Sequence, residues 1–305
     1  MPDRVAGGST SHIIQSLVAN LVIASSKGVA AVFTGSGAML AETIHSFADC
    51  GNQLLLLLGV KRARRAPDAM HPLGYGRSLY FWSFIVALML FVGGGVFSIY
   101  EGIHKLLAPE PVEHVLLGVG TLLFALAIEG AATFSNVREL GRRRGATPFF
   151  RFIRETKDSD LVVVFGENSA ASLGLVFALL ALVLAHLTGD ARWDAAGSLT
   201  VGLVLVGVAI FLAVEVKSLL VGEAADPQIA ESVRATLAEH PQIKELLNVI
   251  TVQQGPGEVM VALKVRVAGE LTSVAVADTI NAFERALKAR SPEVRWCFVE
   301  PDTER

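Results

Sequence analysis

Residues 37–60 read GAMLAETIHSFADCGNQLLLLLGV, an apolar run that also carries a histidine and an aspartate. The run is long enough to cross a bilayer core as a helix, which takes roughly 20 residues. His45 and Asp49 are four residues apart, so a helix places both on one face, one turn apart. An ionisable side chain at the centre of a membrane helix costs about 2.5–3.5 kcal/mol on insertion scales. The pair therefore indicates a functional site that can share one divalent ion, and the alternative is a hydrogen bond that only neutralises two polar groups.

The composition of the whole chain is that of a membrane protein with a smaller soluble part. Of its 305 residues, 52% are hydrophobic and only 18% are charged, whereas soluble domains carry roughly 25% charged residues. The deficit of charge is concentrated before residue 221. We therefore predict a transmembrane domain over 1–221 and a soluble domain over 222–305. The net charge of -3 argues against nucleic acid as a partner.

Apolar runs predict an all-α bundle of six transmembrane helices. The expected spans are 11–33, 37–60, 78–105, 113–140, 159–187 and 195–220. The connections that contain 61–65 and 142–154 are rich in arginine and lysine, so the positive-inside rule places them in the cytoplasm. An even number of spans then places both termini there too. Without a recognisable signal peptide, the expected location is a bacterial inner membrane.

The soluble domain is predicted to be an α+β, ferredoxin-like unit. Asp226 suits a helix N-cap and Pro227 suits the first helical position. Two strand-like runs follow, 246–253 and 258–267, and the second alternates apolar with polar residues. A second helix then precedes a last strand at 293–300, and the order helix–strand–strand–helix–strand is typical of ferredoxin-like sandwiches.

A second group of donors lies in the predicted span 159–187. Glu167 is an intramembrane carboxylate with Asn168 beside it. Taken alone, Glu167 fits a functional ligand and a structural carboxyl, kept protonated or hydrogen-bonded to a neighbouring helix, equally well. Together with His45 and Asp49, it predicts a three-ligand metal site whose exchangeable fourth position is filled by Asn168 or water.

Several segments resemble the cation diffusion facilitator family. The motifs are HSFAD at 45–49, HPLGYG at 71–76 and the predicted ferredoxin-like tail. Three further stretches, at 128–145, 166–174 and 283–295, resemble the mitochondrial-type zinc transporter branch of that family. Members are typically dimeric, proton-coupled exporters of zinc, manganese, iron or cobalt. The likeness covers nearly the whole chain, and a homodimer is expected from it alone.

The resemblance also assigns roles to single positions. His45 and Asp49 match the metal-binding pair of the second helix, and Glu167 matches the aspartate of the fifth. Val163 falls where many relatives carry a histidine ligand, and Asn168 stands where this branch often has an acid. Losing an imidazole makes the donor set harder, which suits manganese or iron somewhat better than zinc.

Three further positions are weaker candidates. Asp68 and His71 resemble a peripheral metal site of some relatives, although Tyr75 occupies its third position and ordinary loop capping is the alternative. Glu129, in the predicted fourth span, is expected either to relay protons or to make a structural hydrogen bond. The tail carries His240 as its only histidine, so we expect no metal cluster there.

The predicted function is efflux of a divalent transition metal, with zinc favoured, by proton antiport and alternating access. The alternatives are transport of manganese, iron or cobalt, a membrane metal sensor that carries nothing, and a carrier of organic solutes. We do not expect an enzyme, because no helix shows a His-Glu-x-x-His pattern. The expected partners are the lipid bilayer, divalent metal ions, protons and a second copy of the chain, with no prosthetic group.

Overall fold

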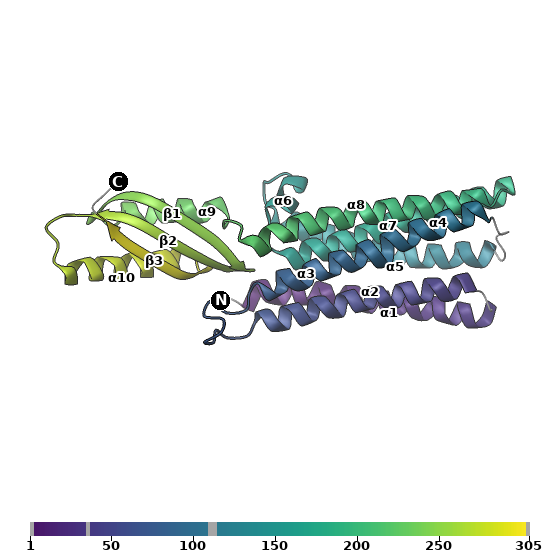
Figure 1. The fold of residues 1–305 in the computed structure, drawn as a ribbon, viewed down its shortest axis with the longest axis horizontal. Helices are drawn as coiled ribbons and strands as arrows, with labels where there is room; N and C mark the ends of the chain where they lie inside the picture. Colours follow the sequence, from purple (N-terminus) through teal and green to yellow (C-terminus); the bar gives the residue numbers. More distant parts are fainter. Residues whose placement is uncertain (1–2, 35–36, 109–114, 303–305) are drawn as a thin grey trace.

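The long helices of the protein form one bundle, and a small sheet with two helices lies at one end of it (Figure 1). The structure is a computed structural model that describes residues 3–34, 37–108 and 115–302. For residues 3–12, 30–31, 33–34, 37–45 and 48 it describes the helical backbone without the side chain. The long helices are α1 (Asp3–Thr34), α2 (Gly37–Ala63), α5 (Val115–Arg143), α7 (Ser159–Thr188) and α8 (Arg192–Val221).

A sixth long helical stretch is built from three parts. The helices α3 (Ser78–Met89) and α4 (Phe97–Leu107) are joined without a break by η1 (Leu90–Val96), a π-helical segment. The segment contains the glycines 93–95, which lack the side chains that would favour a regular helix. The expected helix at 78–105 is therefore present, with a wider turn in its middle. A short helix, α6 (Phe149–Glu155), lies between α5 and α7.

Four helical stretches in the described part of the chain are long and apolar enough to cross a membrane. They are Ser78–Leu107, Val115–Arg143, Ser159–Thr188 and Arg192–Val221. In α1 the apolar stretch is shorter, Ile13–Val29. In α2 the apolar residues are interrupted by the polar residues of the quoted run, which lowers its hydropathy. Four of the predicted spans thus have the length and apolar composition of membrane-crossing helices, and the count of six stays a prediction.

The helices α4 and α8 approach closely because glycines line their contact. A Cβ atom added to Gly202 of α8 would lie 2.7 Å from Ile99 Cγ1, 2.8 Å from the Ile99 nitrogen and 3.0 Å from the Gly95 oxygen. Two of these three atoms belong to the backbone of the neighbouring helical stretch. Small residues allow this approach in membrane bundles, where packing rather than hydrophobicity holds helices together.

The C-terminal part contains a three-stranded sheet. Its elements are α9 (Pro227–Ala238), β1 (Ile243–Gly255), β2 (Glu258–Val267), α10 (Ser273–Arg290) and β3 (Val294–Asp302). The strand order is β1-β2-β3, with β1 and β2 antiparallel and β2 and β3 parallel. The predicted order of helices and strands is confirmed. The first strand is longer than expected, because it pairs with β2 from Ile243 opposite Val267 to Gly255 opposite Glu258.

The core of this C-terminal part follows from the alternation in β2. Val259, Val261, Leu263 and Val265 are buried, and the residues between them are more exposed. These four pack in one cluster with Phe283 and other residues of α9 and α10. Since period-two burial is typical of a sheet covered on one face, the helices cover that face. The predicted N-cap is also confirmed: Asp226 accepts a hydrogen bond from the Gln228 amide at 2.8 Å, with Pro227 in the first turn.

Glu223 connects the helices to the sheet. Its carboxylate pairs with Lys157, which lies just before α7. Its backbone oxygen accepts a hydrogen bond from the Gln253 amide of β1 at 2.9 Å. A second close contact lies nearby, because a Cβ atom on Gly76 would come within 2.6 Å of the Gln254 oxygen.

The glycine contact between α4 and α8 makes a testable prediction about stability. We expect Gly202→Ala to destabilise the bundle, because the added methyl group meets backbone atoms that can move only with their helix. Overpacking of this kind costs about 1–3 kcal/mol. The measurement is the midpoint of thermal unfolding in detergent. Gly207→Ala is the matched control on α8, since an added Cβ there meets nothing within 4 Å. Equal midpoints for the two variants would contradict the close contact.

Candidate metal site within the helical bundle

Glu167 is held inside the bundle by two amides from α2. Its side chain belongs to α7 and is 5% exposed. The carboxylate accepts hydrogen bonds from Asn52 Nδ2 at 2.9 Å and from Gln53 Nε2 at 2.5 Å. A carboxylate buried without such donors would be very unfavourable, so the amides make its position tenable. Sequence reasoning missed both donors, although they follow Asp49 by three and four residues and therefore share its helical face.

Asp49 joins Glu167 and Glu129 in one acidic cluster. Asp49 is half-buried on α2, and Glu129 is 7% exposed on α5. The charge of Asp49 acts on both Glu129 and Glu167, and the charge of Glu129 acts on Glu167. Three helices that are distant in sequence thus bring their carboxylates near one another. We call Asp49, Glu129 and Glu167 the acidic cluster.

The other predicted ligands are placed as follows. His45 lies in α2, one helical turn before Asp49, and its side chain lies outside the described residues. Asn168 is 3% exposed and its side-chain oxygen accepts a hydrogen bond from Ser16 Oγ of α1 at 3.0 Å. Asn168 therefore ties α7 to α1 in this arrangement. Val163 is fully buried in the apolar core of the bundle.

The arrangement differs from that of a loaded metal site. Among the residues whose side chains are described, no three His, Cys, Asp or Glu converge as metal ligands. The Glu167 carboxylate is bound to amides, so ligation of a metal by Glu167 requires it to exchange at least one of them. The Gln53 side-chain oxygen is buried and makes no hydrogen bond within the described part of the chain. It is a further neutral donor beside Glu167.

A buried lysine next to the cluster was also missed. Lys27 of α1 is 6% exposed and donates a hydrogen bond to Ser46 Oγ of α2 at 3.0 Å. Its charge acts on Glu129. The signal was present in the sequence, because Lys27 is the one lysine or arginine within the predicted span 11–33.

The side chain of Asp68 accepts the hydrogen bonds that hold the loop before α3 in place. One carboxylate oxygen accepts hydrogen bonds from the amides of Met70 at 3.0 Å and His71 at 2.8 Å, and the other accepts one from the Tyr75 hydroxyl at 2.6 Å. The Tyr75 hydroxyl, followed by the His71 amide, lowers the pKa of the Asp68 carboxyl. His71 Nδ1 lies 3.6 Å from the carboxylate. This geometry is that of loop capping, and the predicted peripheral metal site stays a prediction.

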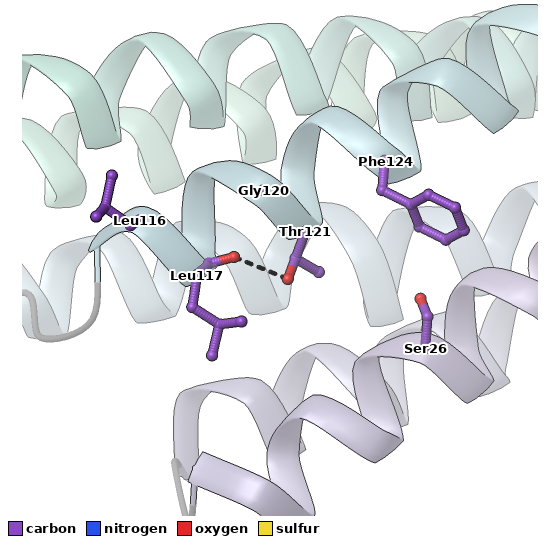
Figure 2. Close-up of a pocket in the computed structure, with 6 residues that line it drawn as sticks. All are labelled: Ser26, Leu116, Leu117, Gly120, Thr121 and Phe124. Carbon is purple, nitrogen blue, oxygen red and sulfur yellow. Dashed lines mark hydrogen bonds between the residues drawn. The ribbon is translucent and has the colours of Figure 1, made fainter.

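Two other features offer little for metal binding. A hollow between α1 and α5 is lined by Ser26, Leu116, Leu117, Gly120, Thr121 and Phe124 (Figure 2). The hydroxyl groups of Ser26 and Thr121 donate to carbonyl oxygens of their own helices, at 2.8 and 2.9 Å. In the tail, His240 Nδ1 lies 2.9 Å from the Thr236 oxygen, at the end of α9.

Comparison with known proteins assigns the family. The family model described as the cation efflux transmembrane domain matches residues 13–221. A Xenopus laevis protein named proton-coupled zinc antiporter SLC30A9, mitochondrial, is 31% identical over 90% of this chain and 56% of its own length. Metal tolerance protein C4 of Arabidopsis thaliana is 33% identical over 73% of this chain and 50% of its own length. The uncharacterized transporter sll1263 of Synechocystis is 22% identical over 92% of this chain and 86% of its own length.

The chain therefore belongs to the cation efflux family. This confirms the resemblance to cation diffusion facilitators, and the mitochondrial zinc antiporter branch is among the relatives that match. The chain spans about half the length of the first two relatives. Their names are those of transporters or metal tolerance proteins, in agreement with the expectation that the chain is no enzyme.

The hydrogen bond from Asn52 to Glu167 predicts a loss of stability when it is removed. We expect Asn52→Ala to lower the free energy of unfolding by about 1–3 kcal/mol, since a buried oxygen of Glu167 loses its hydrogen-bond partner. The measurement is denaturant or thermal unfolding in detergent. Gln15→Ala, which removes an exposed amide from α1, is the control and is expected to change little. Equal stability of the two variants would show that the bond does not form.

The Asp68 cap predicts a dependence on pH. Because the pKa of Asp68 is lowered, its stabilising bonds are fully present above the ordinary carboxyl value of 3.8 and are lost as pH falls through the lowered value. We expect hydrogen-exchange protection of the Met70 and His71 amides to disappear on that acidification, and Asp68→Ala to remove it at neutral pH. The Ala225 amide, bonded to the neutral Thr251 hydroxyl, is the reference. Protection that survives in Asp68→Ala would contradict the cap.

Proposed function

We propose that this protein exports a divalent transition-metal ion, with zinc favoured, in exchange for protons. The observation that carries the proposal is the acidic cluster, which gathers carboxylates from α2, α5 and α7 inside a bundle of apolar helices. Intramembrane carboxylates that face a bundle interior mark ion pathways and proton relays. The names of the Xenopus and Arabidopsis relatives support metal as the substrate.

In the proposed site, His45, Asp49 and Glu167 bind the metal, and Asn168 or water completes the set. For Glu167 this means leaving the amides of Asn52 and Gln53. The described contacts of Asn168 with Ser16 favour water as the fourth ligand. These assignments go beyond the arrangement described above and follow the pattern of the family.

Proton coupling follows from the chemistry of these ligands. Carboxylates and imidazole bind a metal only when deprotonated, so metal and protons exclude one another at the site. His45 has an ordinary pKa range suited to this exchange near neutral pH. Glu129 interacts electrostatically with Asp49, and in this proposal it passes protons to or from the site. Alternating access then requires the bundle to open towards each side in turn.

The proposed topology has six spans, a membrane domain over 1–221 and a ferredoxin-like domain over 222–305 outside the membrane. The two basic connections lie at the end of the bundle next to the sheet (Figure 1), as the positive-inside rule requires if the sheet is cytoplasmic. The expectation of a bacterial inner membrane gains no support from relatives named mitochondrial. We propose that the sheet and both termini lie on the side of the membrane from which the metal is taken. We further propose that two copies of the chain form a homodimer.

Two alternatives fit the same ligands. The oxygen-rich donors and the buried Val163 at the usual histidine position suit manganese or iron. A metal sensor that carries nothing would use the same ligands, and only a flux measurement separates it from a transporter.

The decisive test is metal uptake into proteoliposomes. We expect one of zinc, manganese, iron(II) or cobalt to be transported by the wild type, to respond to a pH gradient, and to be lost at least about a hundredfold in Asp49→Ala and Glu167→Ala. Losing a first ligand removes several kcal/mol of binding, and each 1.4 kcal/mol is about tenfold.

The control is Glu101→Ala, which removes a carboxylate from α4 outside the acidic cluster and is expected to leave flux intact. Metal binding without flux in the wild type would favour the sensor. A metal flux that does not change with the pH gradient would exclude proton coupling.

A further inference from the structure

Lys27 is a cation that the bundle keeps away from both water and lipid. Its side chain is 6% exposed in a helix whose lipid-facing positions, such as Val18, Leu21 and Val29, are open. A lysine placed at random on this helix would extend its charged end to the membrane surface. The ammonium group instead donates to Ser46 Oγ, between α1 and α2.

The surroundings of Lys27 are those of the proposed metal site. Ser46 precedes Asp49 by three residues and therefore lies on the same face of α2. The charge of Lys27 acts on Glu129, whose carboxylate interacts in turn with Asp49 and Glu167. Lys27 of α1 is therefore linked to the acidic cluster through Glu129 of α5 and lies against the face of α2 that carries Asp49.

Stability alone does not explain a lysine at this position. Replacing buried ionic groups with apolar residues of similar size is often neutral or even stabilising. A fixed positive charge does, however, weaken metal binding directly. It reduces the net negative charge of the site and repels any metal ion that binds to the carboxylates.

We propose that Lys27 is the resident counter-ion of the metal site and weakens metal binding so that the ion can leave. This inference rests on the proposed function. Three carboxylates and a histidine with no fixed cation would hold a divalent ion strongly, and a carrier with such a site would release it slowly. The Lys27 ammonium, bonded to Ser46, offsets part of that attraction without occupying a ligand position.

The test is zinc binding to the full-length protein in detergent, measured by calorimetry. We expect Lys27→Met to bind Zn²⁺ at least about tenfold more tightly than the wild type, since it removes a positive charge that repels a divalent ion at the carboxylates. Lys27→Arg keeps the charge and is expected to bind like the wild type. Lys217→Gln, which removes an exposed lysine from α8, is the matched control and is also expected to bind like the wild type.

A second variant separates charge from packing. Glu129→Gln removes a negative charge from the same cluster, so adding it to Lys27→Met is expected to bring zinc affinity back towards the wild-type value. A residue that only packed between α1 and α2 would show no such compensation. Lys27→Gln serves in place of Lys27→Met if the apolar side chain prevents folding.

The outcomes distinguish this inference from the proposed function. If the wild type binds no zinc, manganese, iron(II) or cobalt, the proposed function fails and the counter-ion fails with it. If the wild type binds zinc and a folded Lys27→Met or Lys27→Gln binds it equally or more weakly, the counter-ion alone is overturned. If no uncharged variant at this position folds, Lys27 is a folding residue and the inference is likewise overturned.

Discussion

A carboxylate inside a bundle of apolar helices has to be compensated by groups that the bundle itself supplies. In this protein the compensation of Glu167 comes from two amides of α2. That requirement fixes how α2 faces α7, and it sets Asp49 on the same side. Glu129 of α5 and Lys27 of α1 extend this polar interior, since the charges of Asp49 and Lys27 both act on Glu129. The apolar residues around it, including the fully buried Val163, then fill the space that remains.

Much of the fold was predictable because its signals are local. Long apolar runs predicted the helices, and α7 and α8 begin and end within three residues of the expected spans. The alternation of apolar and polar residues in β2 and the N-cap residue Asp226 helped to predict the order of elements in the tail. Family membership was predictable from short motifs. The helix α2 is the exception in composition, because the residues that carry the chemistry are the ones that reduce its hydropathy.

The site was predictable only in part, because contacts between helices are not local. The sequence identified Asp49, Glu129 and Glu167 as intramembrane acids, and the structure places them in one cluster. It did not reveal that Asn52 and Gln53 bind Glu167, or that Asn168 binds Ser16, since these pairs are more than 100 residues apart. Lys27 was not predicted for a different reason: a lysine is not a metal ligand at neutral pH, so its type alone does not point to a metal site.

The placement of Glu223 has a mechanical consequence. One residue holds the Lys157 side chain with its carboxylate and the β1 backbone with its carbonyl oxygen, directly after α8 ends. Lys157 lies two residues before α7, the helix that carries Glu167. If transport follows the proposed alternating access, a rotation of α7 that moves Glu167 away from its amides also moves Lys157, and Lys157 is paired with Glu223. Under that proposal, either the sheet turns with α7 or the ion pair between Lys157 and Glu223 breaks in each cycle.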